Sequence, residues 1–288
     1  MLKPPIEAIE RLVKAALEED APQGDLTSQT LLPADAVISA ELVAREDGVL
    51  CGEDVFTAAM RLTGPVSVNF AVHDGGRFQA GSMLATVSGP ARAVLQAERV
   101  ALNFVQRLCG IATMTAQYVR ETEGLPARIR PRIVDTRKTT PGLRILERYA
   151  VRCGGGGNHR FSLSDAVMVK DNHLAVLAAS GVGLDEALRA ARAQLPHTMT
   201  IEVEVDRLDQ IDAVLAAGAD TILLDNFSLD ELRSGVLQIA GRALIEASGG
   251  VTLERVRAIA ETSVDLISVG ALTHGARSLD LGLDMRGL

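Results

Sequence analysis

The pattern of hydrophobic and polar residues divides the chain into two halves. Residues 1–20 carry apolar positions at helical spacing among many acidic ones, which predicts an amphipathic helix. Three strand-like runs follow, VISAELVA, VSVNFAVH and MLATVSG, with glycines and aspartates at the turns between them. Residues 91–123 then form a helical pattern whose apolar surface is wide enough to predict burial on several sides.

After Pro131 the pattern changes to short apolar runs that are mostly separated by helical patterns. Glu204, Asp225 and Glu246 lie 21 residues apart, the length of one strand–helix unit. Continuous apolar strands alternating with helices predict a parallel sheet buried on both faces, and the near-constant period favours a barrel over an open sheet. Six strands are evident, fewer than in a regular eight-stranded barrel, so the predicted closure is irregular. The six runs are residues 133–134, 166–169, 201–205, 221–224, 243–245 and 266–269.

Polar or glycine-rich residues follow nearly every one of these predicted strands. In α/β barrels the reacting groups lie at the carboxyl ends of the strands. One charged strand end is usually a solvated loop, but six on the same rim predict an active site. The strand ends are Asp135–Thr140, Lys170–His173, Glu202 with Glu204, Asp225–Asn226, Glu246–Gly250 and Ser268–Gly270.

Positive charge is concentrated between Asp135 and His173. The arginine fork matches a carboxylate with two hydrogen bonds, and lysine supplies a compact charge suited to carboxylate or phosphate. The alternative is that each cation is a surface residue or an ion-pair partner, but their shared place on the rim predicts a site for a small, multiply anionic substrate. The four cations are Arg137, Lys138, Arg160 and Lys170.

A glycine run interrupts this charged segment. Thr140-Pro141 has the form of a helix start, so a helix is predicted from there to about Cys153. Gly154–Gly157 end it and lead to His159 and Arg160. The run is either a flexible helix stop or backbone that passes close to a ligand, and the neighbouring charges favour the second interpretation.

The acidic and glycine-rich strand ends suggest two further subsites. Glu204 and Asp225 end successive strands, where they would hold Mg²⁺ through oxygen ligands or, alternatively, form ion pairs with nearby cations. Ser248-Gly249-Gly250 precedes Thr252, a credible helix cap, and Gly270 follows the last strand. Backbone N–H groups before a helix are a ready phosphate site, so a phosphorylated sugar with Mg²⁺ is the expected second ligand.

Composition narrows the class of protein. The 288 residues carry a net charge of −8, only 3% aromatic residues and no tryptophan, which argues against nucleic-acid and membrane-surface partners. The amino terminus lacks the pattern of a signal peptide, and no apolar stretch reaches the length of a membrane span. The three cysteines are widely spaced and form no metal-binding motif, so zinc is not expected and a reducing, cytoplasmic location is.

Taken together, these stretches resemble the quinolinate phosphoribosyltransferases. They occur in order over nearly the whole chain, and as a set they are highly specific. The stretches are Glu19-Asp20 with Gly24–Ser28, ERVALNFVQRLCGIAT (98–113), DTRKTTPGLRILERYAV (135–151), GGGGNHR (154–160), KDNH (170–173), IEVEV (201–205), LLDNF (223–227), EASGG (246–250) and ISVGALTH (267–274).

The resemblance implies a fold and an activity. The expected fold is an N-terminal α/β sandwich-like domain (1–115), an irregular, roughly seven-stranded α/β barrel (116–272) and a tail (273–288) that returns to the first domain. The expected reaction joins quinolinate to phosphoribosyl pyrophosphate with Mg²⁺ and gives nicotinate mononucleotide, pyrophosphate and CO₂, a step of NAD biosynthesis. The implied assembly is a homodimer with a shared active site, or a hexamer built from such dimers.

The resemblance also implies roles for individual residues. Quinolinate would be bound by Arg99 of a neighbouring subunit together with Arg137, His159, Arg160 and Lys170. Phosphoribosyl pyrophosphate and its metal would be bound by Lys138, Glu204 and Asp225. The metal ligands would be the carboxylates of Glu204 and Asp225. The remaining implied substrate-binding residues, most of them for the ribose 5-phosphate, are Thr136, Ser248, Gly249, Gly250, Ser268, Val269 and Gly270.

Three alternative functions fit parts of the pattern. Lys170 at a strand end could form a Schiff base, as in an aldolase-type lyase, but this leaves the arginines and Ser248–Gly250 unexplained. A related phosphoribosyltransferase with another acceptor, such as the molybdenum-transport-associated relatives, is disfavoured by the acceptor-side Arg and His residues. A non-catalytic ligand sensor on the same fold is disfavoured because Glu204 and Asp225 are both present.

Overall fold

The computed structural model describes residues 3–286, which cluster into two compact units. Unit 1 takes in the described residues up to Ala116, Thr139–Gly155 and the chain from Leu272 onward. Unit 2 consists of Gln117–Lys138 and Gly156–Ala271. Residues 139–155 therefore lie with unit 1, whereas the resemblance implied that they belong to the barrel segment 116–272.

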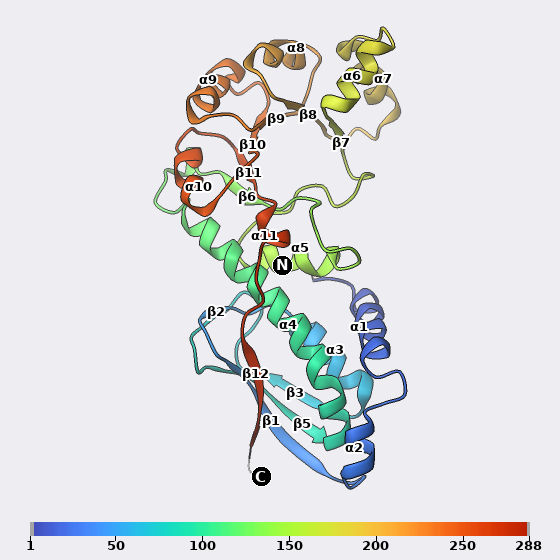
Figure 1. Ribbon diagram of the computed structural model, residues 1–288. Coiled ribbons are helices and arrows are strands. Elements are labelled where there is room, and N and C mark those ends of the chain that lie inside the picture. Colours follow the sequence, from blue (N-terminus) through green and yellow to red (C-terminus); the bar gives the residue numbers. More distant parts are fainter. Residues whose placement is uncertain (1–2, 287–288) are drawn as a thin grey trace. The chain divides into compact units, whose positions relative to one another are not determined.

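Unit 1 is built on an antiparallel sheet in the order β12-β1-β5-β3 (Figure 1). The three strand-like runs of the first half are confirmed as β1, β3 and β5, and β12 from the end of the chain pairs with β1. The predicted long helix is α4, whose apolar residues are buried along most of its length. The strands are β1 (Val37–Ala44), β2 (Gly48–Val49), β3 (Ser67–Phe70), β4 (Arg77–Phe78), β5 (Met83–Pro90) and β12 (Leu281–Arg286); the helices are α1 (Ile6–Asp20), α2 (Leu26–Leu31), α3 (Glu53–Thr63), α4 (Ala91–Arg120), α5 (Arg144–Cys153) and α11 (Ala271–His274).

A buried ion pair explains why helix α5 belongs to unit 1. The Glu147 side chain of α5 is fully buried, and Arg107 of α4 donates to its Oε1 at 3.0 Å. Arg107 also donates to the carbonyls of Thr273 and Ala276. A buried carboxylate must be paired in this way, so one arginine fixes α5 and the start of the final segment against α4.

The predicted start of α5 at Thr140-Pro141 is wrong. The helix begins at Arg144, and the Thr140 hydroxyl donates to Glu147 Oε1 at 2.8 Å while its N–H donates to Oε2 at 3.1 Å. Thr140 thus satisfies a buried carboxylate instead of capping the first turn. The predicted end at Cys153 is confirmed.

Unit 2 contains a fully parallel sheet of six strands in the order β6-β11-β10-β9-β8-β7. Figure 1 shows its helices on the outside of the strands, and the predicted barrel-like α/β fold is confirmed. Gly157 forms a further parallel bridge with Val134 of β6. The strands are β6 (Arg132–Val134), β7 (Val167–Val169), β8 (Ile201–Val205), β9 (Thr221–Asp225), β10 (Leu244–Ser248) and β11 (Leu266–Ser268); the helices are α6 (Asp171–Ala179), α7 (Leu184–Gln194), α8 (Ile211–Ala216), α9 (Leu229–Ile239) and α10 (Leu253–Ala260), with 3-10 turns η1 (Ala127–Ile129) and η2 (Leu208–Gln210).

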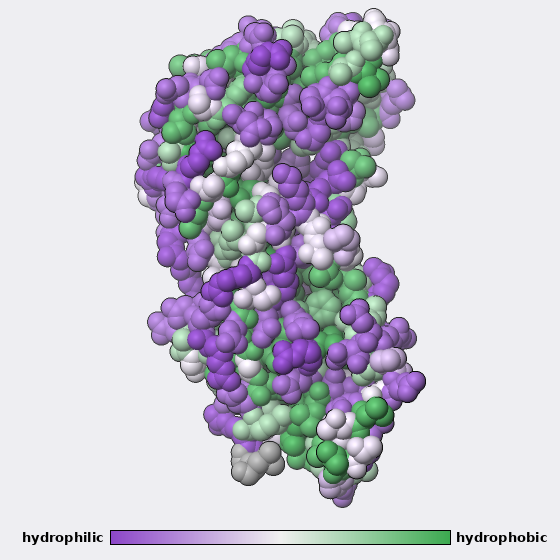
Figure 2. All heavy atoms as spheres, viewed as in Figure 1, coloured by the Kyte–Doolittle hydropathy of each residue, from purple (hydrophilic) through white to green (hydrophobic). Residues whose placement is uncertain are grey.

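Strands β8, β9 and β10 are buried over almost their whole length, as expected for strands covered on both faces. On the face seen in Figure 2, hydrophilic side chains predominate over both units, with hydrophobic residues interspersed. Within the described residues, the longest helices are too polar or too short to cross a lipid bilayer.

Candidate active site

A cavity of about 430 Å³ lies at the carboxyl ends of the strands of unit 2. Each strand contributes residues from its end or from the segment directly after it, which is the place where α/β barrels hold their reacting groups. Ten of the residues predicted for the site line this cavity: Thr136, Arg137, Lys138, His159, Arg160, Lys170, Glu204, Asp225, Ser248 and Ser268. The structure therefore brings the predicted cationic, acidic and serine subsites into one volume.

Two guanidinium groups meet on one side of the cavity. Arg137 follows β6 and Arg160 follows the glycine run, and both are half-buried. Burial, followed by the charge of Arg137, lowers the pKa of Arg160. Arg160 Nη1 donates to the Ala166 carbonyl at 3.0 Å, which fixes the direction of its side chain. Two nearby cations repel each other unless an anion lies between them, so this side of the cavity can accept an anionic group such as a carboxylate.

Asp135 positions the segment that carries His159 and Arg160. Its buried carboxylate accepts the His159 N–H at 2.8 Å and the Asn158 side-chain N–H at 2.6 Å. Gly157 donates to the Ile133 carbonyl at 2.7 Å, and a Cβ on Gly157 would lie 3.2 Å from Val134 Cγ1. The last glycine of the run is thus needed because the backbone passes directly beside β6.

The earlier glycines of the run have a different role. Gly154 follows the end of α5, and a Cβ there would lie 2.3 Å from the Ala112 carbonyl oxygen of α4. Gly155 has a φ of 87°, in the region that favours glycine. The run is therefore a helix stop at its beginning and a close passage of the backbone beside β6 at its end, so the helix-stop interpretation holds for the first glycines.

His159 lies between two buried glutamates. Its Nε2 is 3.2 Å from Glu202 Oε2 and 3.5 Å from Glu246 Oε2. Burial lowers the pKa of His159, but the hydrogen bonds and charges of the two carboxylates prevail and raise it to about 10. The Arg160 N–H, however, donates to Nδ1 at 2.7 Å, which an imidazolium could not accept. With Nδ1 accepting this bond, Nε2 carries the proton that the ring donates to the two carboxylates.

Lys170 and Glu204 form an ion pair at the ends of β7 and β8. The Lys170 N–H donates to His173 Nδ1 at 2.9 Å, so His173 positions the lysine backbone at the start of α6. A side chain that is 42% exposed and paired with a carboxylate lacks the desolvated setting that a Schiff-base lysine requires, which counts against the lyase alternative. Glu204 was predicted as a metal ligand or an ion-pair partner, and in this structure it is paired.

Glu204 and Asp225 offer an oxygen-donor set on one wall of the cavity. Both carboxylates line it from neighbouring strands, and Asp225 Oδ2 accepts the Asn226 side-chain N–H at 2.7 Å. Carboxylate oxygens are suited to Mg²⁺, which keeps several of its waters, and Glu204 Oε2 is engaged by Lys170 in this structure. The residues present therefore fit the expected cation.

The glycine-rich end of β10 packs tightly against the end of β9. Gly249 has a φ of 88°, and a Cβ there would lie 2.6 Å from the Asn226 nitrogen. Asn226 itself has a φ of 60°, and its N–H donates to the Ser248 carbonyl at 3.0 Å. Helix α10 begins after Thr252, as predicted. Ser248 and Ser268 line the cavity, whereas Gly249, Gly250, Val269 and Gly270 follow them in the chain without being among its lining residues.

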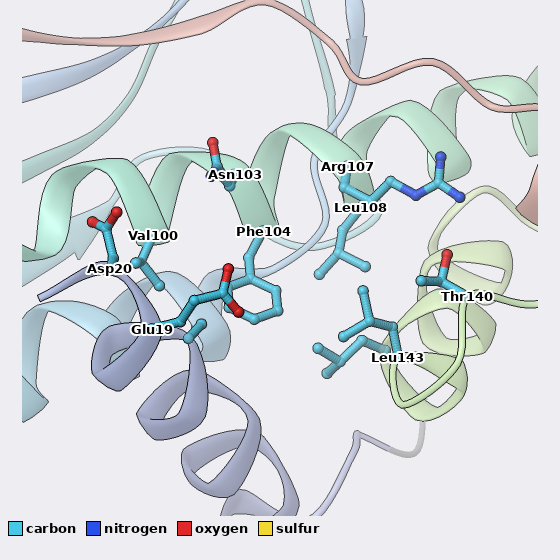
Figure 3. Close-up of a pocket in the computed structure, with 11 residues that line it drawn as sticks. Glu19, Asp20, Val100, Asn103, Phe104, Arg107, Leu108, Thr140 and Leu143 are labelled. Carbon is cyan, nitrogen blue, oxygen red and sulfur yellow. The ribbon is translucent and has the colours of Figure 1, made fainter. Parts of the chain in front are cut away.

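Arg99 is not among the residues that line this cavity. It lies on α4 in unit 1, where its side chain is exposed. The next residue, Val100, lines a separate cavity of about 360 Å³ within unit 1. Figure 3 shows Val100, Phe104 and Leu108 projecting from α4 into that cavity, with Glu19 of α1 beside them.

Three residues that line the active-site cavity were given no role from the sequence: Met168, Leu223 and Glu246, of which only Glu246 had been named, at a strand end. Glu246 is 1% exposed, and its Oε1 has no hydrogen-bond partner among the described residues; the same is true of Oε1 of Glu202, which is 8% exposed. The available signal was a charged residue inside an apolar strand, in LIEAS and in IEVEV. Met168 and Leu223 gave no signal, because apolar strand residues are expected in any core.

Comparison with known proteins gives one consistent family. The family model described as "Quinolinate phosphoribosyl transferase, C-terminal domain" matches residues 111–284, and the corresponding N-terminal domain model matches residues 25–109. The chain is 45% identical to the nicotinate-nucleotide pyrophosphorylase [carboxylating] of Mycobacterium leprae, with 95% of each chain covered. It is 42% identical to a probable enzyme of the same name from Bacillus subtilis, covering 96% of this chain and 93% of the relative.

Solved structures agree with these matches. The crystal structure of NadC from Streptococcus pyogenes superimposes with a TM-score of 0.91 at 40% identity, covering 100% of both chains. The nicotinate-nucleotide pyrophosphorylase from Francisella tularensis gives a TM-score of 0.90 at 36% identity, covering 99% of this chain and 98% of the other.

Proposed function

We propose that this chain, which belongs to the quinolinate phosphoribosyltransferase family, transfers the phosphoribosyl group of phosphoribosyl pyrophosphate to quinolinate. Decarboxylation follows and gives nicotinate mononucleotide, so the chain is an enzyme of de novo NAD biosynthesis. The observation that carries the proposal is that Arg137, Lys138, Arg160 and Lys170 share one cavity with Glu204 and Asp225. These cationic and acidic groups together suit the simultaneous binding of an organic dianion and a metal-bound pyrophosphate.

Quinolinate is held by the cationic side of the cavity. Arg137, Arg160 and Lys170 bind its two carboxylates, and His159 orients Arg160, whose N–H donates to His159 Nδ1. Fixing both carboxylates directs the weakly nucleophilic ring nitrogen towards the anomeric carbon of the ribose. Because the substrate is already oriented when bound, much of the entropy loss of bringing the two atoms together is removed from the reaction step. Arg160 is already held by Ala166, so little of its freedom remains to be lost on binding.

Phosphoribosyl pyrophosphate occupies the other side. The N–C1′ bond forms as the C1′–O bond to pyrophosphate breaks, through an oxocarbenium-like state, and Lys138 stabilises the charge on the departing oxygen. Mg²⁺, held by Glu204 and Asp225, supplies further neutralisation of the pyrophosphate when bound. Thr136, the Ser248–Gly250 backbone and the Ser268–Gly270 segment hold the 5-phosphate and the ribose.

Loss of CO₂ needs no additional cofactor. Once the ring nitrogen carries the ribose, its positive charge stabilises the electron pair that stays on the neighbouring carbon when the C–C bond to the carboxylate breaks. A proton then takes the place of CO₂. The electron sink belongs to the substrate, so the task of the protein is to bind and orient.

The experiment is a pyrophosphate-release assay that compares quinolinate with nicotinate as acceptor, with ¹⁴CO₂ release as a second readout. Turnover with quinolinate and equal yields of pyrophosphate and CO₂ are expected. Turnover with nicotinate alone would overturn the acceptor assignment, and pyrophosphate release without CO₂ would overturn the decarboxylation.

The expected assembly is a homodimer in which Arg99 completes the active site of the partner subunit, with a hexamer of such dimers as the larger form. It is supported by the exposure of Arg99 on α4. Mixing inactive Arg99→Ala with inactive Lys170→Ala and allowing subunits to exchange tests it. Roughly one quarter of wild-type activity is expected, because mixed dimers regain one intact site; no recovery despite demonstrated exchange would refute the shared site.

A cytoplasmic location is also proposed. It is supported by three cysteine thiols that are not in disulfides, as expected in a reducing compartment. Fractionation of cells that express the full chain tests this placement.

A further inference from the structure

The three cysteines, widely separated in the sequence, lie together in unit 1. Cys51 precedes α3, Cys109 lies in α4 and Cys153 ends α5, and all three are buried thiols. The Cys51 N–H donates to Cys109 Sγ at 3.3 Å, and Cys109 Sγ donates to the Cys51 carbonyl at 3.6 Å. The side chains of Cys51 and Cys153 are hydrogen-bonded to each other. The fold thus assembles a cluster that the spacing of the cysteines did not indicate.

Asp74 adds a carboxylate to this cluster. One of its oxygens and the sulfurs of Cys51 and Cys153 all lie within 4.8 Å of one another. Asp74 Oδ1 accepts the N–H groups of Gly52 and Glu53 at 2.8 and 3.2 Å, and Oδ2 accepts the Tyr149 hydroxyl at 2.9 Å. These bonds aim the carboxylate, and they use three of the roughly four acceptor positions that a carboxylate offers.

We propose that Cys51, Cys153 and Asp74 bind one thiophilic divalent cation, for which Zn²⁺ is the representative ion. Zinc takes thiolate sulfur and carboxylate oxygen together, whereas Mg²⁺ and Ca²⁺ take oxygen alone and Cu⁺ prefers sulfur alone. Zinc–ligand bonds of about 2.3 Å to sulfur and about 2.0–2.2 Å to oxygen place the donor atoms of one ion roughly 3.5 Å apart, so donor atoms that lie within 4.8 Å of one another would move closer together on binding.

Binding of the cation requires the thiols to lose their protons. Burial raises the pKa of Cys51 well above its ordinary value and that of Cys109 to about 12, and it raises the pKa of Asp74 as well. The metal-free thiols are therefore protonated. Binding forms two Zn–S bonds, breaks two S–H bonds and releases two protons to solvent, with no change in oxidation state. One divalent charge then faces two thiolates and one carboxylate, so the buried charge is largely compensated.

The surroundings of the cluster indicate which side faces solvent and which segments of the chain a bound cation would join. Asp74 is half-buried and its neighbours His73 and Gly75 are exposed, so the turn at residues 73–76 is the side of the cluster that faces solvent. Cys153 is the last residue of α5, directly before the glycine run. A bound cation would tie together the start of α3, this turn and the end of α5, from which the chain continues to His159.

Cobalt(II) provides the test, because ligation by thiolate gives an intense near-ultraviolet charge-transfer band that oxygen ligands do not. Titration of the full wild-type chain with Co²⁺ is expected to give this band at one equivalent. Native mass spectrometry with Zn²⁺ is expected to give one zinc ion minus two protons. Cys51→Ala and Cys153→Ala are expected to abolish the band. Cys109→Ala is the matched control, since it removes the third thiol and keeps all three ligands; Glu204→Gln, which alters the oxygen-donor set of unit 2, is also expected to keep the band.

The wild-type titration alone decides the proposal if a cysteine variant does not fold. No charge-transfer band in the wild type would overturn it, as would a band that persists in folded Cys51→Ala or Cys153→Ala. A disulfide between Cys51 and Cys153 in protein purified without reductant, detected as a loss of two free thiols, would also overturn it.

Discussion

The ammonium group of Lys170 is paired with Glu204 Oε2 between the ends of two neighbouring parallel strands, β7 and β8. In the chain without ligands, the lysine proposed for the quinolinate carboxylate thus neutralises a carboxylate proposed for the metal. We propose that binding of the two substrates exchanges these partners, so that the dicarboxylate takes Lys170 and Glu204 becomes available to the cation.

This exchange predicts that Lys170→Met raises the affinity of the free enzyme for a divalent cation. Without the ammonium group, the negative charge of Glu204 is no longer neutralised and attracts the metal fully. We therefore expect a several-fold decrease in the Kd for Mn²⁺. Electron paramagnetic resonance of free Mn²⁺ during titration measures it. Lys14→Met, which removes an exposed lysine of α1, is the control. Equal Kd values for the two variants would show that the ion pair does not limit metal access. Because the Lys170 side chain is 42% exposed, the loss of folding stability in Lys170→Met should stay under about 1 kcal/mol.

Arg137→Ala is expected to weaken quinolinate binding while the fold persists. A charge-assisted bidentate hydrogen bond contributes about 2 kcal/mol, so the KM for quinolinate should rise roughly 30-fold or turnover should fall below detection. Steady-state kinetics with both substrates varied measure it. Arg233→Ala, which removes an exposed arginine of α9, is the control and should behave like the wild type. Unchanged quinolinate kinetics in Arg137→Ala would refute its assignment to the acceptor site.

Gly249→Ala tests whether the end of β10 needs its close backbone contact. The added Cβ would fall 2.6 Å from the Asn226 nitrogen at a φ of 88°, so strands β9 and β10 would have to shift. We expect a loss of about 2–3 kcal/mol in the free energy of unfolding and a raised KM for phosphoribosyl pyrophosphate. Gly241→Ala is a matched control, because Gly241 has a φ of 73° with nothing within 4 Å of an added Cβ. It should lose only about 1 kcal/mol and keep its KM. Equal losses in the two variants would mean that the backbone angle alone is responsible.

The strand ends show which features of the site could be predicted from the sequence. The spacing of the apolar runs and the polar residues after them placed Lys170, Glu204 and Asp225 at one rim, because parallel strands of one barrel end at the same edge. The sequence could not show that Lys170 and Glu204 pair, since the strand order β9-β8-β7 arises from tertiary packing. It also could not show that residues 139–155 lie with unit 1, because the contact between Arg107 and Glu147 spans 40 residues.

Buried polar partners were the hardest to predict. Glu202 and Glu246 stand in apolar strands two positions from Glu204 and Ser248, so all four side chains point to the same face in each strand. That periodicity could have drawn attention to them, but only the fold shows that both reach His159. Similarly, Cys51 and Cys153 are 102 residues apart, so no local spacing rule applies to them.

The ion pair between Glu46 and Arg277 predicts a specific acid sensitivity of unit 1. The hydrogen bond from Arg277 is the main cause that lowers the pKa of Glu46 to about 2, from an ordinary value of 4.5. When folding lowers the pKa of a carboxyl group, that group stabilises the folded state at every pH above the pKa that it has in the unfolded chain. That contribution is fully present above about pH 4.5 and is lost as the pH falls towards 2. Because the Arg277 side chain is 70% exposed, the effect should be under about 1 kcal/mol. Urea unfolding of wild type and Glu46→Gln should therefore differ at pH 7, and the difference should shrink at pH 3 and in high salt. A difference that grows on acidification would mean that Glu46 acts through something other than its charge.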